Sequence, residues 1–204
     1  RQRKNPMNCW QCGHSVEPEV HLCQQCHYLQ PPRPGHTHFQ RLEVEENFHQ
    51  DLETLAKNHR RLQRQFHPDR FASQDEKQRR LSLEHATSLN DAYRILRDPC
   101  RRADYMLGLK GMDVTDEGNQ VRLQPMFLME VLELREAMEE LGGPDTHVER
   151  CRITTEVARR YESTLTTLGS GLDSGIPSIE TLAQCAAQLK YLKKILDDLH
   201  LLAG

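Results

Sequence analysis

The sequence has few aromatic residues, no long apolar run and almost no charge surplus. Aromatic residues make up 5% of the 204 positions, so a folded core must depend mainly on leucine, and leucine-rich chains of this kind are usually helical. No stretch approaches the roughly 18 consecutive apolar residues of a membrane span, so we expect no membrane association. A net charge of -3 argues against a protein whose main role is to coat nucleic acid.

The number of cysteines is odd, which fits a secreted disulfide scaffold poorly. Four of the seven lie within residues 9–26, whereas Cys100, Cys151 and Cys185 are scattered. We therefore expect one metal cluster and three ordinary thiols in a reducing compartment. Because the chain begins at Arg1 and not at methionine, we also expect a processed or truncated chain in which a targeting segment is already absent.

The clustered cysteines form two pairs, Cys9-x-x-Cys12-Gly13 and Cys23-x-x-Cys26. Two intervening residues let both thiolates of a pair reach one ion, and four thiolates satisfy tetrahedral Zn²⁺. We predict one structural zinc ion on Cys9, Cys12, Cys23 and Cys26, and no organic cofactor. Three alternatives stay open: His14, His21 or His27 in place of one cysteine, iron or an iron–sulfur cluster on the same ligands, and two disulfides or four free thiols.

After a proline-rich connector at residues 30–35, the pattern predicts helices, with no strands beyond short ones at the cysteine cluster. A basic amphipathic helix ends at Pro68, and a second long helix ends at Asp98-Pro99. The apolar face of the first helix comprises Leu52, Leu55, His59, Leu62 and Phe66, and we expect His59 to be a packed core residue and not a ligand.

Three further helices are expected after a polar boundary at residues 111–120. The first ends at Gly142-Gly143-Pro144. The second begins with Asp145 as N-cap and leaves through a loop at residues 169–177, and Ser178 caps the third. Short loops between such helices favour antiparallel packing.

The tripeptide His67-Pro68-Asp69 stands between the first two long helices. Residues 57–80 hold eight bases against three acids, and the following helix contains Asn90-Asp91-Ala92-Tyr93 before Asp98-Pro99. With Leu62, these features resemble the J-domain of DnaJ-type co-chaperones over about residues 38–110. The resemblance implies that the tripeptide docks on the ATPase domain of a DnaK-type chaperone and stimulates ATP hydrolysis. By position it implies these chaperone-binding residues: His67, Pro68, Asp69, Lys57, Arg60, Arg61 and Arg64.

Two other interpretations of the basic helix and its turn are weaker. A general base at His67 or Asp69 needs a nucleophile or metal within reach, and the sequence shows none nearby. A nucleic-acid face needs aromatic residues between the charges as stacking platforms, and none interleave. A basic face does suit an acidic protein partner, because complementary charge raises the association rate.

The helix near residues 125–141 has more apolar residues than one core stripe needs. At about 100° per residue, Leu128, Met129 and Leu132 point away from that stripe. Residues 128–149 carry seven acids and one base, and an apolar patch with an acidic rim is typical of a protein-binding face. The alternative is that these side chains pack under another helix or under the J-domain.

The stretch from Phe127 to Glu136 is similar to the signature of the HscB family, the specialised J-proteins of iron–sulfur cluster biogenesis. The resemblance implies a face that binds the IscU-type scaffold, made of Leu128, Met129, Leu132, Glu133, Glu136, Glu140 and, as a weaker addition, Tyr191. The four-cysteine module departs from the bacterial form and resembles animal mitochondrial members. It implies the mitochondrial matrix, with the cytoplasm as a second location.

We therefore predict a mainly α protein: a zinc-knuckle module at residues 1–36, a helical J-domain at 37–110, a linker at 111–120 and an antiparallel three-helix client-binding bundle at 121–204. We expect a co-chaperone and not an enzyme, with the mitochondrial DnaK-type chaperone, the IscU-type scaffold and iron–sulfur recipient proteins as partners, and neither nucleic acid nor membrane. The alternatives are a zinc-containing nucleic-acid binder, another protein-interaction adaptor, and a metal-dependent redox or hydrolytic enzyme.

Overall fold

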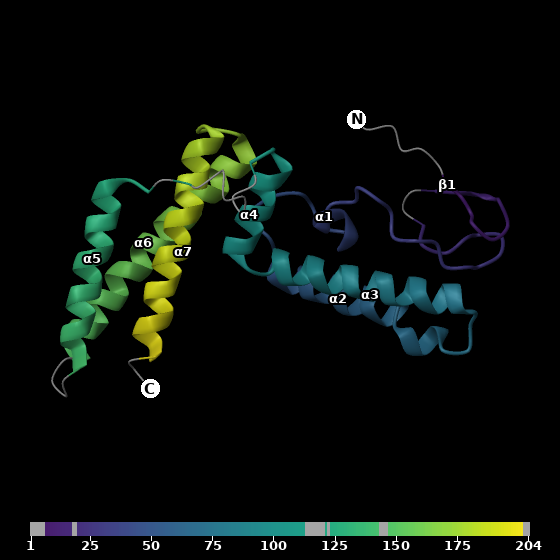
Figure 1. Ribbon diagram of the computed structural model, residues 1–204, viewed down its shortest axis with the longest axis horizontal. Helices are drawn as coiled ribbons and strands as arrows, with labels where there is room; N and C mark the ends of the chain where they lie inside the picture. The colour runs from purple at the N-terminus through teal and green to yellow at the C-terminus, as the bar shows by residue number, and fades with distance from the viewer. Residues whose placement is uncertain (1–6, 18–19, 113–120, 122, 143–146, 202–204) are drawn as a thin grey trace. The chain divides into compact units, whose positions relative to one another are not determined.

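The computed structural model describes residues 7–17, 20–112, 121, 123–142 and 147–201 (Figure 1). A two-stranded antiparallel sheet pairs Met7 with Val16 and Asn8 with Ser15. The other regular elements of the described residues are helical. In chain order the elements are β1 (Met7–Asn8), β2 (Ser15–Val16), α1 (His38–Arg41), α2 (Leu52–Gln65), η1 (Pro68–Phe71), α3 (Glu76–Leu96), α4 (Pro99–Leu109), α5 (Pro125–Glu139), η3 (Glu140–Gly142), α6 (His147–Ser174) and α7 (Ile179–Leu201).

Aspartate side chains start three of these helices. Asp51, Asp75 and Asp98 are the N-caps of α2, α3 and α4, and each accepts a backbone N–H of the first turn. These bonds satisfy donors that have no partner inside the helix. The predicted end at Asp98-Pro99 is therefore also the start of α4, because proline at the first helical position has no N–H to lose.

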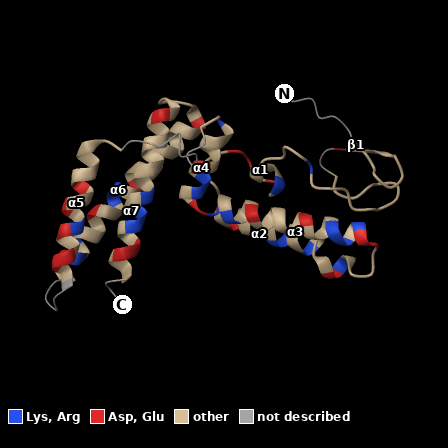
Figure 2. Cartoon of the chain, viewed as in Figure 1, with Lys and Arg blue, Asp and Glu red and all other residues tan. Residues whose placement is uncertain are grey.

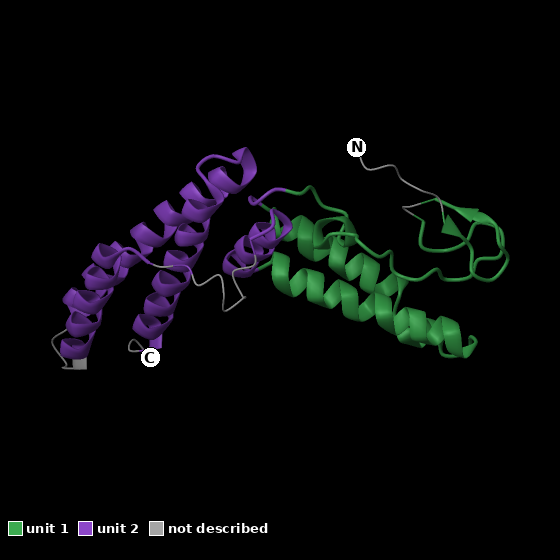
Figure 3. Cartoon of the chain, turned by 45° about the horizontal axis from the view of Figure 1, so that its top comes forward, with its two compact units in different colours: residues 1–46, 50–97 green, residues 47–49, 98–204 purple. Residues whose placement is uncertain are grey.

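The contacts divide the chain into two compact units (Figure 3). The first unit consists of residues 1–46 and 50–97, and the second of residues 47–49 and 98–204. The division falls between Arg97 and Asp98, within the predicted J-domain at residues 37–110. Residues 113–120 of the predicted linker lie outside the described residues. The physical reason is that α4 packs on α6 and α7 of the second unit.

The core of the first unit lies between α2 and α3. Leu55, Leu62 and Phe66 of the α2 segment are buried, as are Leu89 and Leu96 of α3. Leu52, in the first turn of α2, is 54% exposed, so the apolar face begins one turn later than predicted.

His59 differs from the prediction of a core residue. It is half-buried, its ring stacks on Tyr93 with 4.3 Å between centroids, and its Nε2 lies 3.0 Å from Oδ1 of Asn90. A polar ring needs a hydrogen-bond partner when it leaves water, and Asn90 supplies one at the edge of the core.

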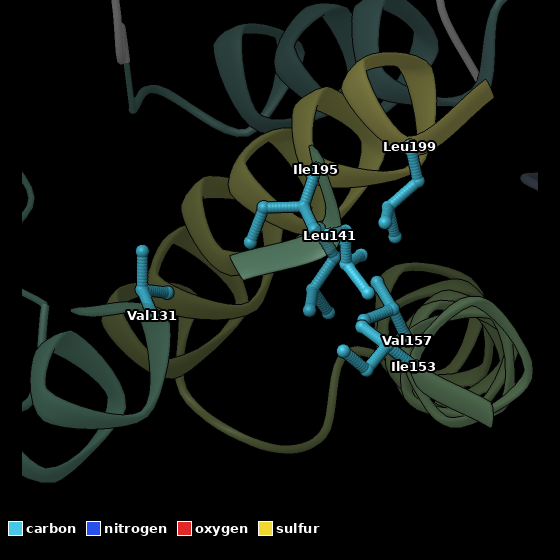
Figure 4. Close-up of a cluster of buried hydrophobic side chains, with 7 residues drawn as sticks. Val131, Leu141, Ile153, Val157, Ile195 and Leu199 are labelled. Atoms are coloured by element: carbon cyan, nitrogen blue, oxygen red, sulfur yellow. The ribbon is translucent and has the colours of Figure 1, made fainter. Parts of the chain in front are cut away.

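The second unit is built on α5, α6 and α7, as predicted, with α4 added to it. Figure 4 shows the buried side chains that converge between the three helices. This cluster comprises Val131, Leu141, Ile153, Val157, Leu192, Ile195 and Leu199. The four-residue connection between Ser174 and Ile179 makes α6 and α7 antiparallel neighbours.

The predicted loop at residues 169–177 is wrong, because α6 continues to Ser174. Gly169 and Gly171 are buried inside the helix. A Cβ on Gly169 would lie 2.5 Å from the Phe48 ring, and one on Gly171 would lie 2.3 Å from Leu182. These glycines permit close packing and do not end the helix. The predicted N-cap Asp145 lies outside the described residues.

Candidate functional site

The four clustered cysteines converge on one point. Their sulfur atoms lie within 4.8 Å of one another, with 3.6 Å from Cys9 to Cys26 and 3.6 Å from Cys12 to Cys23. Tetrahedral zinc with bonds of about 2.3 Å requires sulfurs about 3.8 Å apart, so the cluster fits the ion. All seven cysteines are free thiols, which excludes the disulfide alternative for this structure.

Both cysteine pairs adopt the same backbone turn. The N–H of Gly13 donates to Cys9 O at 2.9 Å, and the N–H of His27 donates to Cys23 O at 2.8 Å. Both residues have positive φ, 74° for Gly13 and 60° for His27, so His27 occupies the position that glycine fills in the first turn. Among the described residues, the ligand group contains no histidine, which favours four cysteines over three cysteines and a histidine.

Without a cation, the four thiols of the cluster do not all ionise. Burial opposes ionisation of Cys9, but hydrogen bonds at the backbone of Cys12 and Gln11 outweigh it and lower the pKa of Cys9 to about 6. A backbone hydrogen bond at Tyr28 favours the Cys26 thiolate, yet desolvation and the neighbouring sulfurs raise the pKa of Cys26 to about 12. Successive thiolates repel one another, so a dication is needed to ionise all four.

The His-Pro-Asp turn is exposed and tightly anchored at its base. Pro68 begins η1, and the N–H of Asp69 donates to Nδ1 of His67 at 3.3 Å. The side chains of His67 and Asp69 are 53% and 91% exposed. Just before the turn, the buried hydroxyl of Ser82 donates to the carbonyl of Phe66 at 2.8 Å. The loop therefore presents an imidazole and a carboxylate to solvent from a fixed point.

The predicted basic face lies on α2 beside this turn (Figure 2). Lys57, Arg60, Arg61 and Arg64 are all exposed. Arg61 forms an ion pair with Glu43, which the sequence prediction missed because the partners are far apart in the chain. Lys57, Arg60 and Arg64 thus carry most of the positive field that this face can offer to a partner.

The predicted apolar face on α5 is open to solvent. Leu128, Met129 and Leu132 are 42%, 62% and 59% exposed, so the other helices of the second unit do not cover them. Glu133, Glu136 and Glu140 are exposed as well. On the opposite side, Val131 is buried in the bundle core.

Two further side chains near this face, Tyr191 and Glu130, differ in their contacts. Tyr191 of α7 is 40% exposed, and its ring lies edge-on to Phe127 with 6.4 Å between centroids. Glu130, in contrast, forms an ion pair of 2.8 Å with Arg160 of α6 and so helps to hold α5 on the bundle. Sequence spacing alone did not separate this structural glutamate from the exposed ones.

Two family profiles match separate parts of the chain. The DnaJ domain matches residues 37–105, and the HSCB C-terminal oligomerisation domain matches residues 123–200. A co-chaperone protein HscB homolog of Burkholderia thailandensis is 36% identical over 159 residues, which cover 78% of this chain and 89% of the relative. A homolog of the same description from Aeromonas salmonicida is 37% identical over 167 residues, covering 80% and 94%.

The chain belongs to the HscB family of co-chaperones. The crystal structure of human co-chaperone protein HscB is similar to it with a TM-score of 0.84 and 26% identity, covering 96% of this chain and 98% of that one. The chaperone HscB from Vibrio cholerae is similar with a TM-score of 0.73 and 30% identity, covering 82% and 98%.

The solved human structure matches more of this chain than the bacterial relatives do. A match over 96% of this chain must include most of the cysteine-bearing residues 1–36, whereas the bacterial matches leave about a fifth of the chain uncovered. The likeness to the human structure therefore extends over most of the cysteine-bearing segment. The chain has the J-domain and the C-terminal domain of a co-chaperone, and its relatives are co-chaperones and not enzymes.

Proposed function

We propose that this HscB-family co-chaperone serves iron–sulfur cluster assembly by delivering an IscU-type scaffold to a DnaK-type ATPase chaperone. The observation that carries the proposal is the presence of two exposed sites of opposite character. One is the His-Pro-Asp turn beside the basic face of α2, and the other is the acid-rimmed apolar face of α5. The protein itself performs no covalent chemistry in this scheme.

The first unit binds the chaperone. Lys57, Arg60 and Arg64 steer an acidic surface of the ATPase domain toward α2, which raises the rate of encounter. The exposed His67 and Asp69 then engage the chaperone from a turn whose proline limits the entropy lost on binding. This contact stimulates ATP hydrolysis by the partner.

The second unit binds the scaffold. Leu128, Met129 and Leu132 offer an apolar patch, and Glu133, Glu136 and Glu140 add a negative rim that suits a basic partner surface. Tyr191 extends the patch from α7. Because one molecule holds both partners, the scaffold is present at a high effective concentration beside the chaperone, which promotes cluster transfer to recipient proteins.

The metal module takes one structural zinc ion. Four protein thiolates fill a tetrahedral shell and leave no position for water, so the ion stabilises the fold and does no catalysis. The mitochondrial matrix is the proposed location, because the cysteine-bearing form resembles the animal mitochondrial members. Free thiols throughout the chain support a reducing compartment of this kind.

The chaperone contact is tested by substituting Asp69→Asn, with Asp91→Asn on α3, whose side chain is 50% exposed, as the control. We expect Asp69→Asn to abolish stimulation of the chaperone ATPase and to leave scaffold binding intact. The control should retain both. Full stimulation by Asp69→Asn would refute the assigned role of the turn.

The scaffold contact is tested by the double substitution of Leu128→Ala and Leu132→Ala. Calorimetric titration with the scaffold should show weaker binding, while chaperone stimulation without scaffold persists. Leu109→Ala is the control, since Leu109 is 44% exposed but lies on α4. Unchanged affinity in the double variant would remove these leucines from the proposed face. Capture of both partners from a mitochondrial extract, and no shift of nucleic acid in a gel, would complete the test.

A further inference from the structure

The segment that leads into the second cysteine pair packs against the base of the His-Pro-Asp turn. His21, two residues before Cys23, places its ring edge-on to Phe66 with 5.0 Å between centroids. Phe66 in turn stacks on His85 of α3 at 4.6 Å and 19°. The His21 and His85 rings also meet edge-on at 5.4 Å. Phe66 directly precedes His67, so this three-ring cluster joins the metal module to the start of the turn.

Buried hydrogen bonds hold the module in this place. Nε2 of His85 lies 2.8 Å from the carbonyl of Gln30, and the N–H of Leu29 donates to Oε1 of Gln78 at 3.3 Å. These four residues are between 0% and 5% exposed. The chain that leaves the second cysteine pair is therefore part of the interior of the first unit and not a loose appendage.

Trp10, between the cysteines of the first pair, attaches the module to α3 at a further point. The indole Nε1 of Trp10 donates to the carbonyl of Leu29 at 2.8 Å. The ammonium of Lys77, in the first turn of α3, lies 3.7 Å from the centroid of the Trp10 ring, which is a cation–π contact. Both cysteine pairs thus contact the helix that follows the turn, and one metal ion would fix the two pairs together.

Phe66 is well placed to transmit this contact. It is the C-cap of α2, it is 1% exposed, and its carbonyl accepts the hydroxyl of Ser82. The orientation of its backbone sets the direction in which His67 leaves the helix. A ring that loses one packing neighbour can repack, and the anchored carbonyl then shifts with it.

We propose that the metal-loaded module positions the His-Pro-Asp turn through His21, so that metal loading sets how strongly the chaperone ATPase is stimulated. This inference deepens the proposed chaperone contact and rests on it. Apart from these attachments to α3, the cysteine-bearing segment of about thirty residues buries too little to stay ordered without its ion. Metal loss would therefore withdraw His21 from Phe66 and loosen the turn without touching any residue that meets the chaperone.

The test compares His21→Ala with His14→Ala in the full-length, metal-loaded protein. His14 is an exposed histidine of the same module and lies outside the ring cluster. We expect His21→Ala to lower maximal stimulation by about three- to tenfold. The concentration for half-maximal stimulation, which the basic face of α2 sets, should change less than twofold. His14→Ala should match the wild type, and His21→Phe, which restores an aromatic edge, should recover most of the loss.

Hydrogen exchange supplies a second readout that does not depend on the chaperone. The amides of Phe66 and Arg70, which donate to Leu62 and His67, should exchange faster in His21→Ala and in chelator-treated wild type than in loaded wild type. If His21→Ala fails to retain metal, His85→Leu replaces it, because this substitution removes the bond to Gln30 from the α3 side.

The outcomes separate the two proposals. A loaded variant that exchanges and stimulates like the wild type would overturn the positioning role of His21. If the loaded wild type itself fails to stimulate the chaperone, the proposed function fails, and the exchange data still decide whether the module orders the turn.

Discussion

The ammonium of Lys193 in α7 lies 2.6 Å from Oδ2 of Asp98, the residue that also caps α4. Burial opposes ionisation of Asp98, but the hydrogen bonds from Lys193 and from the Arg101 amide lower the pKa of this carboxyl. The Asp98 side chain thus caps α4 and also joins α4 to α7 through an ion pair. A second pair, Lys190 with Asp104 at 2.7 Å, repeats the connection six residues further along the chain, on α4.

Removing this ion pair should destabilise the second unit. We expect Lys193→Met to lower the free energy of unfolding by about 1 kcal/mol, because the pair is only partly shielded from water. Lys194→Met, on an exposed neighbour, should change it by less than about 0.5 kcal/mol. Urea denaturation followed by circular dichroism measures both.

The effect should also depend on pH. A carboxyl whose pKa is lowered by folding stabilises the folded state above its unfolded pKa, and this contribution is lost as the pH falls through the lowered folded value. The difference between wild type and Lys193→Met should therefore shrink below about pH 4. A difference that persists in acid would mean that the aliphatic stem of Lys193, and not its charge, holds the helices.

Gly169→Ala should destabilise the protein although alanine favours helix. The added Cβ would lie 2.5 Å from the Phe48 ring and 2.7 Å from His49, so the rings must move, at a cost of about 1–3 kcal/mol. Gly108→Ala in α4 is the control, since no atom lies within 4 Å of its new Cβ. That change should stabilise by about 0.5–1 kcal/mol. The midpoint temperature of thermal unfolding should therefore fall for Gly169→Ala and rise for Gly108→Ala.

Thiol titration should distinguish the seven cysteines. In metal-loaded protein we expect one fast-reacting thiol, Cys151, because it is exposed on α6. Cys100 should react slowest, since burial raises its pKa to about 11 and leaves about one thousandth of it ionised at pH 8. A strong chelator should release four further thiols, those of the cysteine cluster. Cys151→Ser should remove the fast phase, and a fast phase that survives it would place another thiol at the surface.

Substitutions of two adjacent residues on α5 should differ in their effect on the free energy of unfolding. Val131→Ala removes methyl groups from the bundle core and should cost about 1–3 kcal/mol of folding free energy. Leu132→Ala acts on a side chain that is 59% exposed and should stay within about 0.5 kcal/mol of wild type. Equal destabilisation by both would mean that Leu132 is covered in solution.

The sequence predicted best those features that depend on residues close together in the chain. The spacing of the four cysteines predicted the cluster, and Ser178 correctly marked the start of the last helix, where its hydroxyl accepts the Thr181 N–H. The three-four repeat correctly assigned Val131 to the core and pointed Leu132, which is exposed, away from it. The family resemblance supplied the layout of the two helical parts, and the matched profiles confirm it.

Contacts between distant segments could not be predicted in this way. Gly169 lies in a glycine- and serine-containing stretch that is typical of a loop. Only the neighbouring Phe48 ring shows why glycine is needed inside α6. Pro99 ended one helix as predicted, but its role as the first residue of α4 was missed. The cluster of His21, Phe66 and His85 joins three segments whose separations follow no helical repeat, so no local pattern signals it.

Residues 47–49 give the two units an unusual connectivity. The segment lies between α1 and α2, yet the Phe48 N–H donates to Asp173 at 2.7 Å, and the Arg102 guanidinium lies 4.8 Å from the centroid of the Phe48 ring. The chain therefore passes between the units three times, after residues 46, 49 and 97. No single cleavage can release either unit intact, because cutting before Asp98 leaves the second unit without the Phe48 ring that packs on Gly169. The recombinant C-terminal fragment should consequently aggregate more readily than the whole chain unless a peptide spanning residues 47–49 is supplied.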